Sequence, residues 1–472
     1  MPLVMPPPID PVLWGAIAAD VAMASTADAG GLAQRREQRL RRLLARARDR
    51  SPYYRRALER RDVEKARLDE LPIVRKAELM RRFDEWVTEP AIRLDTLRHF
   101  ISDASRIAEP YLDRYVVWES SGSSGEPAVF VQDALSLAVF DALDAIRRPM
   151  LRPSRRWLDP WGWGERIAFV GATSGHFAST VSMERLRRLN PALAQQLRCI
   201  SFMQPLKDIV RQIDAMAPTV IATYPSAAAL LAQERLQGRM RTVPREMWTG
   251  GEHLSPATRE LIGRAFGCAL ADSYGASEFL SIAFQCEHGA LHLNSDWAIL
   301  EPIDSRGRPV PPGEAGATVL LTNLANQVQP IIRYDLGDRV VLHANRCACG
   351  SPLPVIEVEG RCEDTLCLGS GRTGSVRVLP LALSTAIEEE AGLFDFQVVQ
   401  NGPCDLLLRT GSQDAGAVLM LRKAQRVLDE FLRSQGATGV RIACRAGEPG
   451  QLGRSGKMSR VVAASTPSPG GP

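Results

Sequence analysis

A short run of hydroxyl and glycine residues is the strongest local signal for chemistry in this chain. Residues 120–127 read Ser-Ser-Gly-Ser-Ser-Gly-Glu-Pro, and apolar β-type segments flank them at 115–118 and 129–131. Backbone N–H groups at glycine, together with small hydroxyl donors, can wrap closely around an anion such as a phosphate chain. The run lacks the Lys-Ser/Thr pair of a Walker loop. The alternative is a flexible Ser/Gly turn.

Two further motifs could hold a nucleobase and a metal ion. Residues 248–252 read Trp-Thr-Gly-Gly-Glu, a strand end that runs into a diglycine turn where backbone can approach a flat ring or a ribose. Residues 272–278 read Asp-Ser-Tyr-Gly-Ala-Ser-Glu. Here an aromatic ring can stack on a base, and a carboxylate can hold Mg²⁺ beside phosphates. Either motif alone could be an ordinary turn.

Charged residues late in the chain add a ribose-binding and a catalytic candidate. Asp338 is a turn carboxylate that could accept both ribose hydroxyls, as the acidic residue of dinucleotide folds does. Lys457 stands on a glycine loop, from which a flexible ammonium could reach a developing negative charge. The alternatives are an exposed aspartate and a surface lysine.

Cysteine and histidine residues form a separate pattern typical of a metal site. Cys347 and Cys349 make a Cys-x-Cys pair on a turn, and Cys286, His288 and His292 stand in one short segment. Three thiolates and one imidazole would make a closed tetrahedral site for structural Zn²⁺. The sequence leaves open whether His288 or His292 is the ligand. The alternative is buried thiols without a metal.

Aromatic residues near expected strand ends could line a ligand pocket, because ligands bind there in open α/β sheets. They suit an aromatic ligand, although such rings also fill ordinary cores. His176, in a Gly-His-Phe turn, could approach a ligand bound there, and the alternative is a structural histidine. The aromatic candidates are Trp118, Trp161, Trp163, Phe177 and Tyr224.

The segments that must position these residues alternate in type, which predicts an α/β fold. The first hundred residues read as helices, including an amphipathic one with an arginine-rich solvated face around 35–50. Segments 166–171 and 220–224 read as buried strands, with helices at 208–216 and 226–237 beside them. This pattern predicts layered α/β subdomains around a partly parallel sheet.

The second half of the chain divides further. Short strands separated by Pro/Gly turns after residue 297 predict a small β-barrel-like part or meander. A boundary is expected near residue 360, which gives a large domain over 1–359 and a small α+β domain over 360–464, and the family resemblance described below implies that the small domain is mobile. The small domain should contain a strand at 396–399 and a helix at 415–434. Residues 465–472 have the composition of a disordered tail.

Composition excludes several classes of function. The 472 residues are 45% hydrophobic and 24% charged, with a net charge of +4, which is too balanced for nucleic-acid binding as the main role. No apolar run approaches the roughly 20 residues that span a bilayer. The N-terminal segment lacks the pattern of a secretory signal. With nine cysteines and no disulfide-scaffold spacing, we expect a cytosolic protein.

Taken in order, the motifs resemble the AMP-forming adenylating superfamily, most closely its phenylacetate–CoA ligase branch. The resemblance covers nearly the whole chain. It extends to segments outside the motifs above, namely Ser51–Arg55, Leu71–Lys76, Leu321–Leu324 and Pro330–Tyr334. What it implies is a two-step ligase in which a carboxylate attacks the α-phosphate of Mg-ATP, pyrophosphate leaves, and coenzyme A captures the acyl-adenylate.

The resemblance also implies a role for each motif residue. Gly250, Gly251 and Glu252 would border the adenine, with Tyr274 stacked on it beside Gly275. Glu278 would hold Mg²⁺, and Asp338 with Arg361 would bind the ribose. Lys457 would bridge carboxylate and α-phosphate, near a hinge at 361–364. The β- and γ-phosphates would be cradled by Ser120, Ser121, Gly122, Ser123, Ser124 and Gly125. Some members of the branch bind zinc at positions similar to the Cys/His set.

One departure from the family stands in the phosphate loop itself. The family commonly has lysine where this chain has Glu126, and an anion beside a triphosphate is unfavourable, so we expect Glu126 to face solvent. The resulting prediction is an aryl acid–CoA ligase, in which the aromatic residues above would line the acyl pocket and His176 could approach the reacting carboxylate. The open alternatives are another acceptor (an amine, a carrier thiol or a phenol that takes AMP) and a nucleotide-binding module without catalysis. The oligomeric state stays open, with a homodimer as one arrangement.

Overall fold

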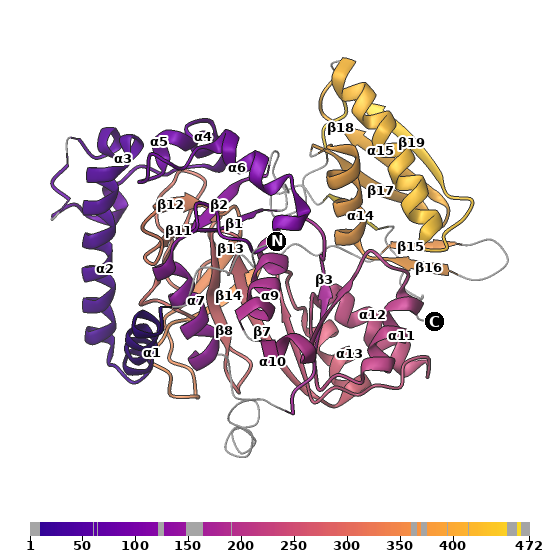
Figure 1. The fold of residues 1–472 in the computed structure, drawn as a ribbon, viewed down its shortest axis with the longest axis horizontal. Coiled ribbons are helices and arrows are strands. Elements are labelled where there is room, and N and C mark those ends of the chain that lie inside the picture. The colour runs from indigo at the N-terminus through magenta and orange to yellow at the C-terminus, as the bar shows by residue number, and fades with distance from the viewer. Residues whose placement is uncertain are drawn as a thin grey trace.

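The computed structural model describes most of the chain. The described residues are 10–59, 61–63, 65–120, 127–147, 164–189, 191–359, 366–369, 375–393, 395–413, 415–450 and 460–463. Among these residues, we find no helix whose length and apolar character would let it cross a membrane. The architecture is a mixed α/β fold, as the alternating sequence pattern predicts (Figure 1).

Helices occupy the first hundred residues, in agreement with the sequence. Asp10 begins the first helix by accepting hydrogen bonds from the N–H groups of Val12 and Leu13, and Asp28 caps the second in the same way through Gly31. The elements are α1 (Pro11–Ser25), α2 (Ala29–Arg50), α3 (Pro52–Ala57), η1 (Leu68–Glu70), α4 (Lys76–Arg81), α5 (Phe83–Trp86), α6 (Leu94–Ile101) and η2 (Ala104–Arg106).

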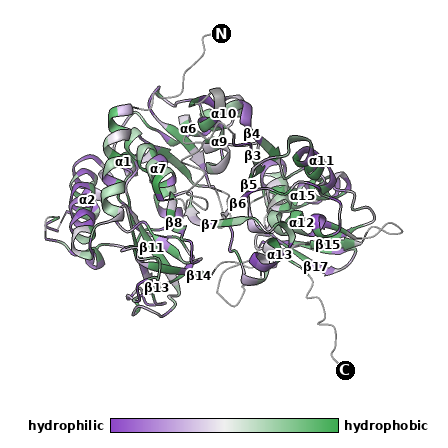
Figure 2. Ribbon diagram, turned by 90° about the horizontal axis from the view of Figure 1, so that it is seen from below, coloured by the Kyte–Doolittle hydropathy of each residue, from purple (hydrophilic) through white to green (hydrophobic). Residues whose placement is uncertain are grey.

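The predicted amphipathic helix is α2. It buries Leu40, Leu43 and Leu44, while Arg42 and Arg46 on other sides are exposed. Figure 2 shows hydrophilic residues along α2, whereas hydrophobic residues concentrate on the strands. Part of the arginine-rich face is therefore solvated, as expected, and the rest makes specific contacts.

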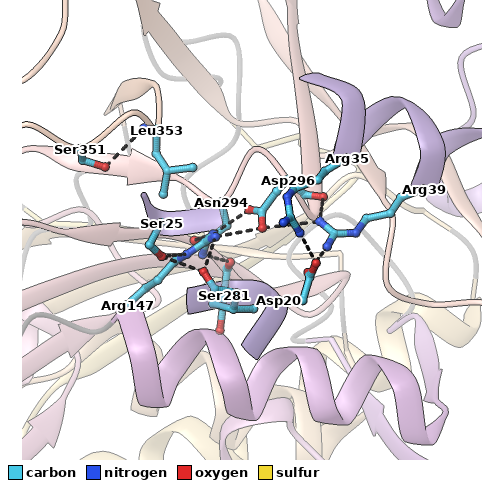
Figure 3. A network of polar contacts seen from close by, with 11 residues as sticks. Asp20, Ser25, Arg35, Arg39, Arg147, Ser281, Asn294, Asp296, Ser351 and Leu353 are labelled. Carbon is cyan, nitrogen blue, oxygen red and sulfur yellow. Dashed lines mark hydrogen bonds and ion pairs between the residues drawn. The ribbon is translucent and has the colours of Figure 1, made fainter. Parts of the chain in front are cut away.

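A buried polar network attaches the helices α1 and α2 to the body of the protein (Figure 3). Arg147 donates to both carboxylate oxygens of Asp296 at 2.6 and 2.9 Å, and to Asn294 at 2.9 Å. On the same side Arg39 binds Asp20 and stacks over Trp297 with its guanidinium 3.5 Å from the ring centroid. These bonds satisfy the buried charges, as buried ionic groups require.

A large mixed sheet forms the centre, with the strand order β13-β14-β9-β8-β7-β6-β5-β3-β4. The strands from β4 to β7 in that order are parallel, and the pairing turns antiparallel from β7 onward. The bounds are β3 (Ile167–Gly171), β4 (Leu197–Ser201), β5 (Val220–Thr223), β6 (Glu246–Gly250), β7 (Ala269–Ala276), β8 (Phe279–Gln285), β9 (Leu291–Leu293), β13 (Arg339–His343) and β14 (Val355–Glu359).

Helices between these strands provide the crossovers that a parallel sheet needs. The strands and helices predicted at 166–171, 208–216, 220–224 and 226–237 are all present within a few residues. The helices are α7 (Ala134–Arg147), α9 (Ala178–Leu189), α10 (Pro191–Gln196), α11 (Leu206–Met216), α12 (Pro225–Leu236) and α13 (Pro256–Phe266).

Two smaller antiparallel sheets complete this part of the chain. One is the pair of β1 and β2, which flanks the Ser/Gly run, and the other is a meander in the order β10-β11-β12. The meander corresponds to the small β part that the sequence predicts after residue 297. The bounds are β1 (Val116–Glu119), β2 (Val129–Gln132), β10 (Ala298–Ile303), β11 (Thr318–Asn323) and β12 (Ile331–Asp335).

The remaining elements form a small α+β unit that lies beside α12 and β3 (Figure 1). Its sheet has the order β19-β18-β17-β20, next to the pair β15-β16. The elements are β15 (Leu366–Gly369), β16 (Ser375–Val378), α14 (Pro380–Ala386), the π-helical turn η4 (Ile387–Ala391), β17 (Gln397–Gly402), β18 (Asp405–Thr410), α15 (Ala415–Ser434), β19 (Arg441–Ala446) and β20 (Val461–Val462).

Apolar and polar contacts connect the small unit to the large sheet. One apolar cluster contains Val170 and Ile221 of the sheet together with Leu383 of α14. Ser174 donates to Glu389 Oε2 at 3.1 Å, and Gln435 donates to the carbonyl oxygen of Met203. The small unit is thus packed against the carboxyl ends of the parallel strands.

Candidate active site

A cavity of about 1810 Å³ lies at the carboxyl ends of the parallel strands, where open α/β sheets bind ligands. It collects residues from distant motifs of the sequence. Those that line it are Ser120, Gly250, Gly251, Glu252, Tyr274, Gly275, Glu278 and Asp338. Eight further residues predicted to belong to the site or to stand beside it lie outside the described residues: Ser121, Gly122, Ser123, Ser124, Gly125, Glu126, Arg361 and Lys457.

A hydrogen bond joins the aromatic and the acidic candidates for nucleotide binding. The hydroxyl of Tyr274, on β7, donates to Asp338 Oδ2 at 2.9 Å, just before β13 begins. Burial and the neighbouring Asp338 raise the pKa of Tyr274 well above its usual value. The phenol therefore stays neutral and fixes the carboxylate at the cavity wall. This bond joins a base-stacking candidate to a ribose-binding candidate.

Glu278 is almost fully buried, with 9% of its surface exposed, yet it lines the cavity. Burial raises the pKa of its carboxyl group, while the Tyr334 hydroxyl and the Lys76 ammonium act in the opposite direction. A buried carboxylate that faces a cavity is a candidate ligand for a divalent cation, which would offset the cost of its burial. The side chain thus fits the predicted Mg²⁺ ligand.

Lys76 is a cavity residue whose role the sequence does not reveal. It begins α4, lines the cavity and attracts the Glu278 carboxylate. Its position is set by a parallel bridge between Val74 and Tyr334, in which the Val74 N–H donates to Arg333 O and the Asp335 N–H donates to Val74 O, each at 3.0 Å. The only signal in the sequence is its place in the segment Leu71–Lys76, which carries part of the family resemblance.

The diglycine turn after β6 has the close packing that its sequence predicts. Gly251 has φ of +80°, and a Cβ there would lie 3.0 Å from the Tyr224 ring. Glu252 accepts hydrogen bonds from the N–H and hydroxyl of Ser226, at 2.9 and 3.0 Å, at the start of α12. Burial raises the pKa of this carboxyl group. Glu252 therefore anchors the turn to α12 at the edge of the cavity.

His176 lies away from the cavity that the other candidates share. Its ring is fully buried, 5.9 Å from the Phe100 ring centroid, and it is not among the residues that line the cavity. Burial lowers the pKa of its imidazole. The turn that carries it pairs with β1 instead, since the Glu119 N–H donates to the His176 carbonyl oxygen at 2.8 Å. The position favours the structural alternative over a catalytic role.

The aromatic acyl candidates divide into three groups. Phe177 and Tyr224 line the cavity, and Trp118 is buried with its indole N–H donating to the Ser277 carbonyl oxygen at 2.8 Å. Trp161 and Trp163 lie outside the described residues. Residues of α9, β3 and β6 form a further part of the cavity wall, which the sequence did not indicate. It consists of Phe169, Ser179, Ser182, Met183, Leu186 and Trp248.

Cys286, His292, Cys347 and Cys349 form a compact cluster, with all four ligand atoms within 4.8 Å of one another. The Sγ atoms of Cys286 and Cys347 are 3.7 Å apart, and His292 Nε2 is 3.3 Å from Cys349 Sγ. His292 Nδ1 lies 2.9 Å from the Leu353 carbonyl oxygen, so an Nδ1–H tautomer leaves Nε2 for a metal. Three sulfurs and one imidazole nitrogen suit tetrahedral Zn²⁺.

His288, the other histidine that the sequence offers as a metal ligand, lies outside this cluster. His288 extends from the turn with about half of its side chain exposed, and its nearest charged partner is Glu287 at 3.9 Å. It is not part of the cluster, whose histidine is His292 on β9. The sequence left the choice between the two open, and the pairing of β9 with β8 and β14 decides it.

Comparisons with known proteins agree with the fold and with the family resemblance. The chain is 26% identical over 387 residues to a phenylacetate-coenzyme A ligase of Thermus thermophilus, with 78% of each chain covered. A solved 2-hydroxyisobutyryl-CoA ligase, in complex with its acyl-AMP and CoA, superposes with a TM-score of 0.57 at 20% identity, over 93% of this chain and 91% of that one. In a postadenylation state the same ligase gives a TM-score of 0.54, over 94% and 91%.

No family model matches the chain. The structural likeness extends over both the large sheet and the small C-terminal unit, since nearly the whole chain is covered. The sequence likeness and the fold together confirm that this chain resembles the AMP-forming adenylating superfamily, with a relative in its phenylacetate–CoA ligase branch.

Proposed function

We propose that this protein activates a carboxylic acid with ATP and transfers the acyl group to coenzyme A. The carboxylate attacks the α-phosphate, pyrophosphate leaves, and the thiol of coenzyme A then displaces AMP from the acyl-adenylate. The observation that carries the proposal is the shared cavity, which brings Ser120, Gly250, Tyr274, Glu278 and Asp338 together from distant parts of the chain. The ligases to which the chain is similar support the same reaction class.

In this function the cavity residues mainly bind and orient the nucleotide. The Tyr274 ring would stack on the adenine while its hydroxyl holds Asp338 for the ribose. Glu278 fits a Mg²⁺ ligand, and the bound ion would neutralise charge on the phosphates. Catalysis then comes from positioning and electrostatic stabilisation rather than from a covalent step on the protein.

Cationic groups must offset the negative charge that builds up at the α-phosphate. We propose that Lys457 does this in the first step, as the resemblance implies. Lys76 stands beside Glu278 and would provide a second positive charge. With Lys76 in this role, the site would have a second positive charge even though Glu126 stands where the family commonly has lysine.

The domain organisation stays a proposal as well. We propose a large domain over 1–359, a small domain over 360–464 that carries Lys457, and a tail over 465–472. A hinge near Arg361 would let the small domain change its position between the two half-reactions. The separate sheet β19-β18-β17-β20 supports this division, because it makes no ladder with the large sheet in the described residues.

The acid is proposed to be aromatic or otherwise apolar. The cavity wall formed by Phe169, Phe177, Met183 and Trp248 is apolar, with hydroxyl groups on Ser179 and Ser182. Such a wall favours a flat or aliphatic acyl group with few charges. The name of the relative from Thermus thermophilus points the same way.

Structural Zn²⁺ is proposed for the cluster of Cys286, His292, Cys347 and Cys349, because its donor set and compact geometry fit that ion. When bound, zinc would cross-link two segments, residues 286–292 and 347–349. The cytosolic location and a homodimer stay predictions from the sequence.

Acid-dependent exchange of pyrophosphate into ATP tests the proposal. Exchange with an acid from a broad aromatic and aliphatic panel is expected, and it would establish adenylation. Product analysis with and without coenzyme A then identifies the acceptor, which separates the thioester from an amide, a carrier thioester or an adenylated phenol. A protein that binds ATP but shows no exchange with any acid would instead be a nucleotide-binding module.

A further inference from the structure

The side chain of Gln285 lies between the Cys/His cluster and the strand that carries the nucleotide motif. Gln285 is the last residue of β8, directly before Cys286, and only 2% of it is exposed. Its Nε2 donates to the Gly289 carbonyl oxygen at 2.8 Å, and its Oε1 accepts from the Asp272 N–H at 3.0 Å. Both ends of one amide group are thus engaged with backbone, and Arg259 Nη1 donates a longer hydrogen bond to the same Oε1 at 3.4 Å.

The first contact holds the turn that links two of the cluster's ligands. Cys286 and His292 stand at either end of this turn, in which the Gly289 N–H donates to Cys286 O and the Cys286 N–H donates to Ala290 O, each at 2.9 Å. Gly289 has φ of +81°, a conformation that suits glycine. A metal held by both ends of the turn would fix the position of the Gly289 carbonyl group.

The second contact holds the start of the nucleotide motif. Regular pairing of β7 with β8 begins at Ser273 and Phe284, so the Asp272 N–H lies just beyond the ladder. The Gln285 side chain supplies the acceptor that this amide group needs. Asp272 also accepts from the Thr249 hydroxyl at 2.7 Å, which connects β7 to β6 before the diglycine turn.

Both contacts face the cavity. Asp272, Gln285, Gly289 and Leu291 all line it, together with Tyr274 two residues further along β7. The amide of Gln285 has a defined orientation, because its nitrogen must face a carbonyl group and its oxygen must face an N–H group. A shift of the turn would therefore change the position of β7, the strand that presents Tyr274.

We infer that Gln285 is a positioning residue that couples metal occupancy of the Cys/His cluster to nucleotide affinity. Metal binding fixes the turn 286–292, Gln285 transmits this to Asp272, and β7 then presents Tyr274 to the nucleotide. The inference rests on the proposed function, in which the cavity binds ATP. It adds a second role for the cluster, which would affect nucleotide affinity as well as stabilise the fold.

Two variants separate this coupling from simple destabilisation. Gln285→Glu keeps an acceptor for the Asp272 N–H but places an oxygen against the Gly289 carbonyl group, so it breaks the contact on the cluster side. Gln329→Glu is the matched control, because Gln329 is also buried and also accepts from one backbone N–H (Val131, 2.8 Å) and donates to one carbonyl oxygen (Val129, 3.0 Å). Gln329 does not line the cavity.

Calorimetric titration with Mg-ATP measures the coupling in zinc-loaded and chelator-treated protein. Metal removal should weaken ATP binding by about fivefold or more in the wild type and in Gln329→Glu. In Gln285→Glu, ATP binding should already be weaker with zinc bound, and removal should change it less than about twofold. Metal analysis should find about one zinc per chain in all three loaded proteins.

Each contrary result has a distinct meaning. A Gln285→Glu protein that responds to chelation as strongly as the wild type would refute the coupling, as would a wild type whose ATP affinity ignores the metal or that holds no metal. A protein that binds no ATP at all would refute the proposed function instead. In that case hydrogen exchange at the Asp272 amide still decides the inference, because chelation should speed this exchange in the wild type.

Discussion

The hydroxyl of Tyr274 donates a hydrogen bond to Asp338 across 2.9 Å, although 63 residues separate the two in the chain. Tyr274 belongs to β7 and Asp338 to the turn before β13. The bond therefore joins the two halves of the proposed nucleotide subsite.

Removing this bond should weaken nucleotide binding. In Tyr274→Phe the ring remains for stacking, but Asp338 loses this one hydrogen bond, and a bond to a charged acceptor is worth about 1.5–3 kcal/mol. We expect the KM for ATP to rise roughly tenfold with a smaller change in kcat. Tyr111→Phe is the matched control, because the Tyr111 hydroxyl bonds to Thr96 away from the cavity. An unchanged KM in Tyr274→Phe would contradict the assignment.

Lys76 should contribute to catalysis through its charge. Lys76→Met keeps much of the side chain's length but removes the ammonium whose charge attracts the Glu278 carboxylate, so the rate of pyrophosphate exchange should fall about tenfold or more. Lys65→Met is a suitable control, because Lys65 is largely exposed and pairs only loosely with Asp62 at 3.8 Å. Equal exchange rates in the two variants would show that Lys76 is a bystander.

The packing of the small C-terminal unit should depend on pH through Glu119. Burial, and then the nearby Glu389, raise the pKa of Glu119 to about 7. The folded state therefore favours the protonated form. The protonated carboxyl group therefore contributes to the free energy of unfolding. This contribution is fully present below the ordinary pKa of a glutamate and is lost as pH rises towards 7, where the folded form also ionises.

Thermal unfolding across pH measures this effect. Between pH 4.5 and pH 8, the unfolding midpoint of the wild type should fall relative to that of Glu119→Gln, because only the wild type must ionise a buried group. Glu260→Gln, on the exposed side of α13, should show no such trend. Parallel curves for the wild type and Glu119→Gln would rule out the role of Glu119.

The buried pair of Arg147 and Asp296 should be important for stability. Asp296→Asn leaves the guanidinium without its counter-charge, and breaking a buried pair on one side costs about 3–5 kcal/mol. The surface pair Arg441–Asp405 gives the comparison, for which Asp405→Asn should cost at most about 1 kcal/mol. Urea unfolding measures both, and similar losses would show that the network in Figure 3 does not act as a buried anchor.

Histidine variants test the choice of metal ligand. His292→Ala should lose most of the bound zinc, because it removes the one nitrogen of the cluster. His288→Ala should keep zinc, since this side chain points into solvent. Metal analysis of the two purified proteins, side by side, gives the answer; zinc retained in His292→Ala would overturn the ligand set.

The sequence predicted those features that depend on local pattern. The helix at 415–434 was found with its exact bounds because its apolar residues repeat at helical spacing. Tyr274, Glu278 and Asp338 were predicted because each stands in a recognisable motif. The structure brings them to one cavity, and their roles in nucleotide binding stay predictions.

What the sequence missed depends on contacts between distant segments. Lys76 reaches the cavity only because Val74 pairs with Tyr334, and no local pattern at residue 76 indicates this. His176 turns its ring towards Phe100 rather than the cavity, which is decided by how the turn packs on β1. The choice between His288 and His292 likewise required the register of β9.

The bridge between Val74 and Tyr334 also has a consequence for biosynthesis. The segment that presents Lys76 finds its partner strand only after about 260 further residues have been made, which takes roughly 10–50 s at ordinary rates of translation. Until then the apolar side chains of Leu71, Val74 and Leu79, which are buried in the finished protein, lack part of their packing. Nascent chains of this protein should therefore depend on chaperones during synthesis, and should be most prone to aggregation when translation stops between these two segments.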